Sequence, residues 1–108
     1  MSTAVLEDRI FQALADPSRR AIFVSLTRGE VAVKDLTARF DISQPAISQH
    51  LATLKEAGLV KGRREGRCVY YQVDPRGMKP LIDWIAHYRA FWTQHVGRLE
   101  QLLETLDG

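Results

Sequence analysis

One change in the spacing of apolar residues, at Gly58, constrains the fold of this chain more than any other feature. Before Gly58, apolar residues recur every three or four positions, which predicts helices. Residues 59–73 change to the alternation that is typical of strands, with Gly66 where two strands would turn. Helices followed at once by a hairpin predict an α+β fold that is mainly α with one β-hairpin.

Four helices are expected before Gly58, over about residues 4–15, 17–26, 33–40 and 44–57. Asp16 and Ser43 are predicted to cap the second and the fourth, because a side-chain oxygen at that position accepts a backbone N–H. The second helix is apolar on most sides, so we expect its neighbours to enclose it. About three residues separate the third and fourth helices, which makes them a helix-turn-helix candidate.

The helical period returns from about residue 78 to residue 106. Apolar residues here follow one another at intervals of three and four, like the seam of a coiled coil. Because this apolar face exceeds what a small core can cover, we expect a homodimer in which a second copy packs against it. The expected dimer interface comprises Leu6, Ile10, Leu81, Ile85, Tyr88, Trp92, Val96, Leu99 and Leu103.

The chain has 108 residues, which is the length of one domain. We expect a single domain over residues 1–108, with a central core over 17–73 and dimerisation helices over 4–15 and 78–106. Cys68 is the one cysteine, so no internal disulfide can form. No segment has the pattern of a membrane span or of a signal peptide. These features favour a cytoplasmic protein without a membrane partner.

The fourth predicted helix has the two unlike faces that a helix needs to enter a DNA major groove. Ile47, Leu51 and Leu54 share one face, and the opposite face is small or hydrogen-bonding and nearly uncharged. Gln49 suits bidentate hydrogen bonding to adenine, and Ser48 suits a base or a phosphate. The candidate DNA-binding residues of this helix are Ser43, Gln44, Pro45, Ala46, Ser48, Gln49 and Thr53.

The predicted hairpin is basic around its turn. Four basic residues stand against one acidic residue between Lys61 and Arg67. We therefore predict that Arg63, Arg64 and Arg67 contact backbone phosphates or an adjoining minor groove. Two plainer interpretations stay open: a polar helix in an all-α bundle, and charges that keep an exposed hairpin edge from pairing with other strands.

Nothing in the sequence predicts a catalytic arrangement, a cofactor or a metal site. His87 and His95 lie too far apart on the last predicted helix to bind one ion, although a site between subunits is conceivable. Cys68 follows Arg67, whose charge favours a reactive thiolate, and a half-buried strand cysteine is the plainer interpretation. A metal or thiol-redox sensor of unusual ligation is therefore one alternative function.

Three stretches resemble the ArsR/SmtB family of bacterial winged helix-turn-helix repressors. They are residues 14–20 (LADPSRR), residues 43–51 (SQPAISQHL) and residues 56–60 (EAGLV), together with the paired tyrosines of the hairpin. The resemblance extends from about residue 6 to residue 106. It implies a winged helix-turn-helix of about five helices that dimerises through its first and last helices and binds operator DNA until an effector relieves repression.

The metal sites of that family do not carry over to this chain. Its arsenic, cadmium and lead sensors have a Cys-x-Cys pair in the helix before the recognition helix, where this chain has Ala32 and Lys34. Its zinc and nickel sensors have Asp and His two positions apart in the last helix, whereas Asp83 is followed by Ile85 here. The chain resembles the branch without metal ligands, and its effector is not specified by these residues.

These features together predict a sequence-specific DNA-binding transcriptional regulator that represses genes by binding double-stranded operator DNA as a homodimer. A different hypothesis is an interaction module that binds a protein or a hydrophobic ligand through its aromatic C-terminal helix. Neither hypothesis makes the chain an enzyme.

Overall fold

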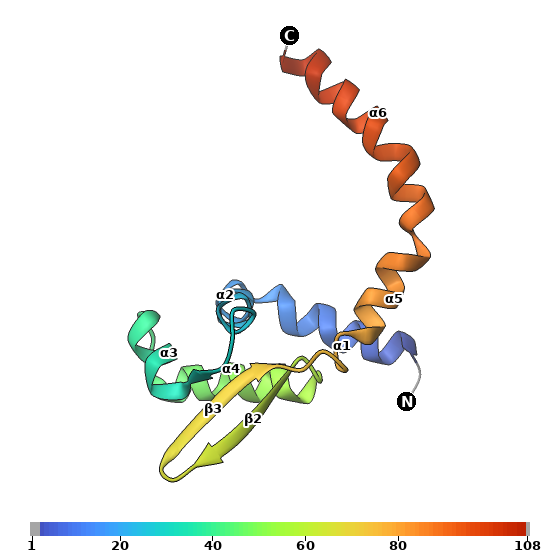
Figure 1. Cartoon of the computed structure of the whole chain (residues 1–108). Coiled ribbons are helices and arrows are strands. Elements are labelled where there is room, and N and C mark those ends of the chain that lie inside the picture. The colour runs from blue at the N-terminus through green and yellow to red at the C-terminus, as the bar shows by residue number, and fades with distance from the viewer. Residues whose placement is uncertain (1–2, 108) are drawn as a thin grey trace.

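The computed structural model describes residues 3–107 of the chain. This part contains six helices and three strands, joined by turns and short loops. Side chains at positions 3, 4, 90, 92, 94, 96, 99 and 107 are outside the description. Figure 1 shows α1 to α4 gathered around the sheet, with the C-terminal helices leading away from them. The elements are α1 (Thr3–Ala15), α2 (Pro17–Leu26), β1 (Val31–Ala32), α3 (Val33–Arg39), α4 (Gln44–Glu56), β2 (Val60–Glu65), β3 (Cys68–Val73), α5 (Lys79–His87) and α6 (Arg89–Asp107).

The predicted helix-turn-helix is confirmed, with residues 40–43 joining α3 to α4. Both predicted caps are confirmed as well. The Asp16 carboxylate accepts the backbone N–H of Arg19 at 3.0 Å, and the Ser43 hydroxyl accepts that of Ala46 at 3.3 Å. The apolar face of α4 packs into a core that also takes residues from α1, α2, α3, β1 and β2. Local sequence signals therefore determine where these helices begin and which way α4 faces.

The strand β2 begins almost directly where α4 ends. Leu59 and Val60 follow the helix as core residues, so the chain turns from helix to strand inside the protein. Two backbone bonds fix this junction: the Leu59 N–H donates to the Leu54 carbonyl at 3.0 Å, and the Asp74 N–H donates to the Leu59 carbonyl at 2.9 Å. Both ends of the hairpin are thus attached to the C-terminal end of α4.

The hairpin is confirmed, and a strand that the sequence did not predict joins it. The order in the antiparallel sheet is β1-β3-β2, with Val31 opposite Tyr71 and Arg63 opposite Tyr70. Gly66 turns the hairpin with φ of +61°, which matches the first central position of a type II′ turn. The strand β1 has two residues, which is too short for any alternation to be visible in the sequence.

The expectation of one long helix over residues 78–106 is wrong, because two helices, α5 and α6, occupy this segment. Tyr88 leaves helical geometry at φ −99° and ψ 9°, and its N–H donates to the Ile85 carbonyl, three residues back, at 3.2 Å. The apolar spacing continues through this point and so could not reveal the break. Beyond it, α6 projects from the molecule (Figure 1), and the radius of gyration is 17.3 Å where about 13 Å is typical of a compact domain of this size. None of the described helices combines the length and apolarity needed to cross a membrane.

Two further expectations about burial need correction. Ile22 and Leu26 anchor α2 in the core, but Val24 is 58% exposed, because neighbours cover one side of this helix and not all sides. Ile10 was predicted in the dimer interface, yet only 1% of it is exposed in one chain. Its side chain packs in the core of its own chain and is not available to a second subunit.

Replacing Gly77 with alanine should destabilise the attachment of the hairpin to α4. A Cβ at this position would overlap the carbonyl oxygen of Gly58, so the backbone would have to move apart. We expect a loss of about 1 to 3 kcal/mol in the free energy of unfolding, measured by urea denaturation. The matched control in the same turn is Arg76→Ala, whose side chain is 88% exposed and whose replacement should cost less than about 0.5 kcal/mol. Equal stability of the two variants would contradict this close approach.

Candidate nucleic-acid interface

The helix α4 presents two unlike faces, as the sequence predicts. On the inner face, Ile47, Leu51 and Leu54 are completely buried. Predicted DNA-binding residues on the outer face are exposed, with Ala46 and Thr53 half-buried at its edges. Lys55, in the last turn, is the first residue of α4 with a formal charge at neutral pH. The exposed residues are Ser43, Gln44, Pro45, Ser48 and Gln49.

The polar side chains of this outer face differ in how they are engaged. The Ser43 hydroxyl caps the helix, and the Thr53 hydroxyl donates to the Gln49 carbonyl at 3.2 Å. Within residues 3–107 as described, the side chains of Gln44, Ser48 and Gln49 have no hydrogen-bond partner. These three are therefore able to bond base edges or phosphates without breaking contacts inside the chain.

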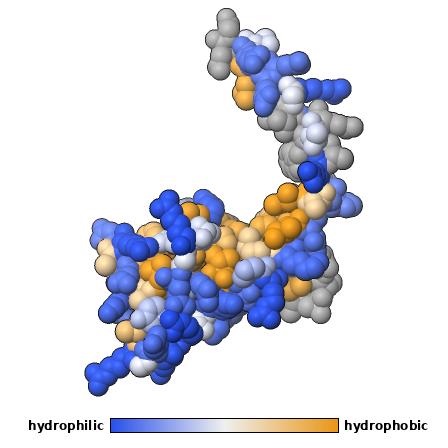
Figure 2. Space-filling model, viewed as in Figure 1, coloured by the Kyte–Doolittle hydropathy of each residue, from blue (hydrophilic) through white to orange (hydrophobic). Residues whose placement is uncertain are grey.

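The hairpin of β2 and β3, hereafter the wing, divides its arginines between two faces. Arg64 lies opposite Val69, on the face of the hairpin that packs against the core further along the strands. Arg63 lies opposite Tyr70, on the other face. Arg67 lies in the turn. Arg64 and Arg67 are exposed, and neither has an ion pair among the described residues. Figure 2 shows that the end of the wing is hydrophilic.

Arg63 is held by contacts that cross the sheet. Its Nη2 and Nε donate to the two carboxylate oxygens of Glu30 at 2.6 and 2.8 Å, and its Nη1 donates to Glu65 at 2.8 Å. Its guanidinium carbon lies 4.6 Å from the centre of the Tyr70 ring. Tyr70 is on the central strand, so Arg63 reaches over it from β2 to the residue just before β1. We call these contacts the Arg63–Glu30 clamp.

The Arg63–Glu30 clamp stays ionised at neutral pH. The hydrogen bonds from Arg63 lower the pKa of the Glu30 carboxyl below its ordinary value. The carboxylates of Glu30 and Glu65 in turn raise the pKa of Arg63. All three guanidinium nitrogens of Arg63 already donate to carboxylates, so this geometry does not favour Arg63 as a phosphate contact. Glu30 could not be predicted from the sequence, because 33 positions separate it from Arg63 and no spacing rule links them.

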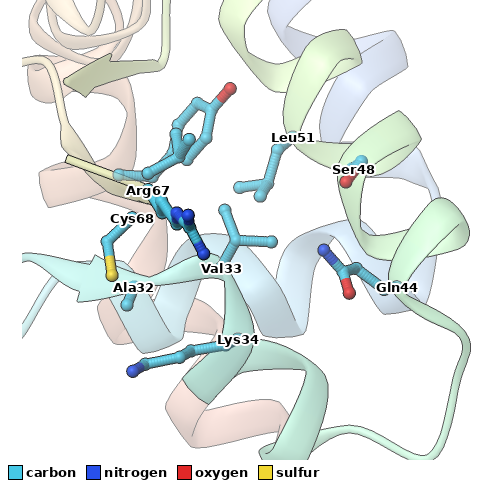
Figure 3. A pocket seen from close by; sticks show the side chains of 10 residues that line it. Ala32, Val33, Lys34, Gln44, Ser48, Leu51, Arg67 and Cys68 are labelled. Atoms are coloured by element: carbon cyan, nitrogen blue, oxygen red, sulfur yellow. The ribbon is translucent and has the colours of Figure 1, made fainter. Parts of the chain in front are cut away.

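The wing and α4 face each other across a pocket of about 270 Å³. In Figure 3, Gln44 and Ser48 on α4 lie on one side, Arg67 and Cys68 lie on the other, and Leu51 lies between them. The fold thus brings Gln44, Ser48 and Arg67 together, although they were predicted from separate motifs. The lining does not include Gln49 or Arg64.

A second set of exposed apolar side chains lies on α5 and on the described parts of α6, at residues 82–91 and 102–106. We call it the C-terminal strip, and Figure 2 shows its beginning as apolar surface where α5 leaves the rest of the molecule. The Trp84 ring joins it to α1, with its centre 5.4 Å from Phe11 and 5.1 Å from Tyr88. Phe11 was not predicted here. The exposed large residues of the C-terminal strip are Ile82, Ile85, Tyr88, Phe91, Leu102, Leu103 and Leu106.

Apart from Ile10, which is buried in the core, the predicted dimer residues fall into three groups. Ile85, Tyr88 and Leu103 are exposed on the C-terminal strip. Leu6 and Leu81 are half-buried, and Leu81 also packs against the core. The side chains of Trp92, Val96 and Leu99 lie outside the described residues, so their predicted role stays a prediction.

The residues considered for metal or redox chemistry are dispersed. Among the described residues, no group of three or more histidine, cysteine or acidic side chains is placed to hold a metal ion. His87 packs edge-on against Tyr88, and His95 Nδ1 lies 2.8 Å from the Phe91 carbonyl oxygen. Cys68 is a half-buried free thiol at the edge of the pocket.

Comparison with known proteins agrees with this arrangement. The family model described as "Bacterial regulatory protein, arsR family" matches residues 16–61, from the cap of α2 into β2. The HTH-type transcriptional regulator Rv2034 of Mycobacterium tuberculosis is 42% identical over 105 residues, covering 97% of this chain and 95% of that protein. The transcriptional repressor SdpR of Bacillus subtilis is 33% identical over 81 residues, covering 75% of this chain and 90% of that protein. The crystal structure of an ArsR family transcriptional regulator matches with a TM-score of 0.73 at 30% identity, covering 83% of this chain and 93% of the other.

Proposed function

The chain belongs to the ArsR family of bacterial regulatory proteins, and from this premise we propose that it is a sequence-specific DNA-binding repressor. The observation that carries the proposal is the exposed outer face of α4, which has no formal charge before Lys55 and on which the side chains of Gln44, Ser48 and Gln49 have no partners within the described chain. A helix in a major groove needs hydrogen-bonding side chains with access to base edges, and formal charge of either sign is not required there. Its neighbour, the wing, supplies the cations.

The two parts of this surface have different tasks in the proposal. Gln44, Ser48 and Gln49 read base edges from α4, with Gln49 as the residue suited to adenine. Arg64 and Arg67 contact phosphates beside the groove, which adds affinity that does not depend on sequence. Arg63 holds the wing in position through the Arg63–Glu30 clamp and does not contact DNA. The other helix residues predicted to bind DNA, Ser43, Pro45, Ala46 and Thr53, shape the edges of the surface.

The proposed assembly is a homodimer through α1, α5 and the C-terminal strip. The strip carries more large exposed apolar side chains than isolated surface residues account for, and it projects away from its own core, where a second copy can cover it. Two α4 helices related by a two-fold axis would then enter successive major grooves on one face of the duplex. Residues 17–73 would serve as the DNA-binding core of a single domain, working in the cytoplasm, where its DNA is.

The other functions raised by the sequence receive less support. An interaction module would bind a partner protein or a hydrophobic ligand through the C-terminal strip. In the proposed dimer a second copy of the chain already covers that surface. A metal or thiol sensor needs a cluster of ligands, and the described histidines and Cys68 lie on separate elements. A regulator that acts by binding DNA requires no catalysis.

The wing and α4 can be separated by their different effects on DNA binding. Because the proposed dimer has two wings, Arg64→Ala combined with Arg67→Ala removes four phosphate contacts, which should reduce the slope of log affinity against log salt by about 3 to 4 and weaken binding to all sequences alike. Gln49→Ala should leave that slope unchanged and reduce the preference for the operator by about 1 to 3 kcal/mol for each of the two half-sites. Fluorescence anisotropy on operator and scrambled duplexes over a salt series measures both. A double arginine variant with an unaltered slope would refute the phosphate contacts.

Glu30→Gln tests the role of Arg63, because the two possible roles predict opposite changes in operator affinity. If Arg63 positions the wing, losing the clamp should weaken operator binding about two- to fivefold, the scale of an exposed ion pair, even though the variant removes a negative charge. Arg63→Gln should weaken operator binding to the same extent. The variant that combines Glu30→Gln with Arg63→Gln should bind no more weakly than either single variant, because both changes break the same interaction. Glu104→Gln, which removes a negative charge from α6, is the control and should not weaken binding. Tighter binding by Glu30→Gln would show that a freed Arg63 contacts DNA.

The dimer can be tested with one charge on the C-terminal strip. Ile85→Glu and Leu103→Glu should each raise the dimer dissociation constant at least about a hundredfold, because a carboxylate would be buried in an apolar interface. Light scattering measures the mass, and circular dichroism should show an unchanged fold, since both side chains are half exposed within one chain. Val24→Glu places the same charge on an exposed apolar position of α2 and should remain dimeric. Dimeric Ile85→Glu and Leu103→Glu variants would rule out this interface.

A further inference from the structure

The pocket between α3, α4 and the wing carries an unbalanced positive charge. Lys34 and Arg67 both line it, and no aspartate or glutamate does. Neither cation has an ion pair among the residues that the structure describes, whereas Arg63, Arg76 and Lys79 all do. We propose that this pocket binds a small organic anion with an apolar body, and that the bound anion acts as an effector that releases DNA.

The walls of the pocket explain why the anion needs an apolar body. Val33, Leu51, Val69 and Tyr71 form an apolar part of the lining, and Leu51 belongs to the core. An inorganic anion would leave these side chains against water, whereas a hydrocarbon or aromatic group would cover them. The volume of about 270 Å³ lies just below the usual range for ligand pockets, so the ligand is small.

Four polar side chains surround that apolar part. Lys34 and Arg67 can pair with a carboxylate, sulfonate or phosphate group, and Gln44 and Ser48 can donate hydrogen bonds to it. In Figure 3, Arg67 lies on the side of the pocket opposite Gln44 and Ser48, and the exposed side chain of Lys34 extends along the pocket's edge, from which it can turn toward a bound anion. The uncompensated pair of cations distinguishes an anion from a neutral ligand.

The effect on DNA follows from shared residues and rests on the proposed function. Gln44, Ser48 and Arg67 are also proposed DNA contacts, so an anion that occupies them removes hydrogen bonds and positive charge from the interface. By linkage, DNA must weaken anion binding by the same factor. Ala32 and Lys34 line this pocket at the positions where metal sensors of the family have cysteines, so its ligand chemistry differs from theirs.

Amide NMR on the full-length protein tests the pocket without DNA. The probe is 4-phenylbutyrate, and 4-phenylbutanol is its uncharged counterpart. We expect phenylbutyrate to shift amides in residues 32–34, 44–51 and 67–71, and phenylbutanol to bind at least about tenfold more weakly. Lys34→Met and Arg67→Met should each weaken phenylbutyrate binding about tenfold, because each keeps an apolar stem and loses one charge. Arg76→Met, on an exposed arginine outside the pocket, should bind as the unmodified protein does.

The outcomes separate the two proposals. Equal binding of the two probes, shifts confined to α5 and α6, or no shifts at millimolar probe would overturn the anion pocket. A second arm measures operator binding with saturating phenylbutyrate, which should weaken the unmodified protein at least about tenfold and Lys34→Met much less. Unchanged operator affinity in the presence of bound probe would overturn the effector role. Absence of operator binding without any probe would instead refute the proposed function and leave the NMR result standing.

Discussion

Burial of one continuous apolar line, from Ile47 through Leu54 to Leu59 and Val60, determines the rest of this structure. Because α4 turns into β2 inside the core, the same buried residues fix the orientation of the helix and the starting point of the wing. Because the inner face is fixed, the outer face is fixed too, and that outer face is polar and carries no formal charge before Lys55. Neither surface can be rotated relative to the other without exposing core residues, which costs about 25 cal/mol for each Å².

The three arginines of the wing differ in the contacts that they already make within the chain. Arg63 is satisfied by two carboxylates and a tyrosine ring, so its contribution is to hold three strands together. Arg64 and Arg67 have no such partners among the described residues and can interact with an external anion. Counting basic residues in the sequence treats these arginines as equal, and the contacts show that they are not. Arg67 also lines the pocket, which connects the proposed DNA contacts to the proposed ligand site.

Local signals were enough to predict much of the fold. Asp16 and Ser43 mark helix starts, Gly66 marks the hairpin turn, and the spacing of Ile47, Leu51 and Leu54 gives the buried face of α4. Features set by distant parts of the chain could not be predicted. The two residues of β1 become a strand only by pairing with β3, the clamp joins residues far apart, and the break at Tyr88 interrupts no apolar spacing. Ile10 shows the same limit, because an apolar stripe does not tell a core from a subunit interface.

Binding of the purified protein to DNA from upstream of its own gene, against scrambled DNA of equal length, tests the central claim most directly. The comparison is made at about 50 mM and about 200 mM salt, a range over which phosphate contacts lose much of their affinity. Specific recognition through α4 predicts that both affinities fall with salt while the preference for upstream DNA persists. Equal affinities that disappear together at the higher salt would contradict it, since the chain would then offer DNA only a basic surface.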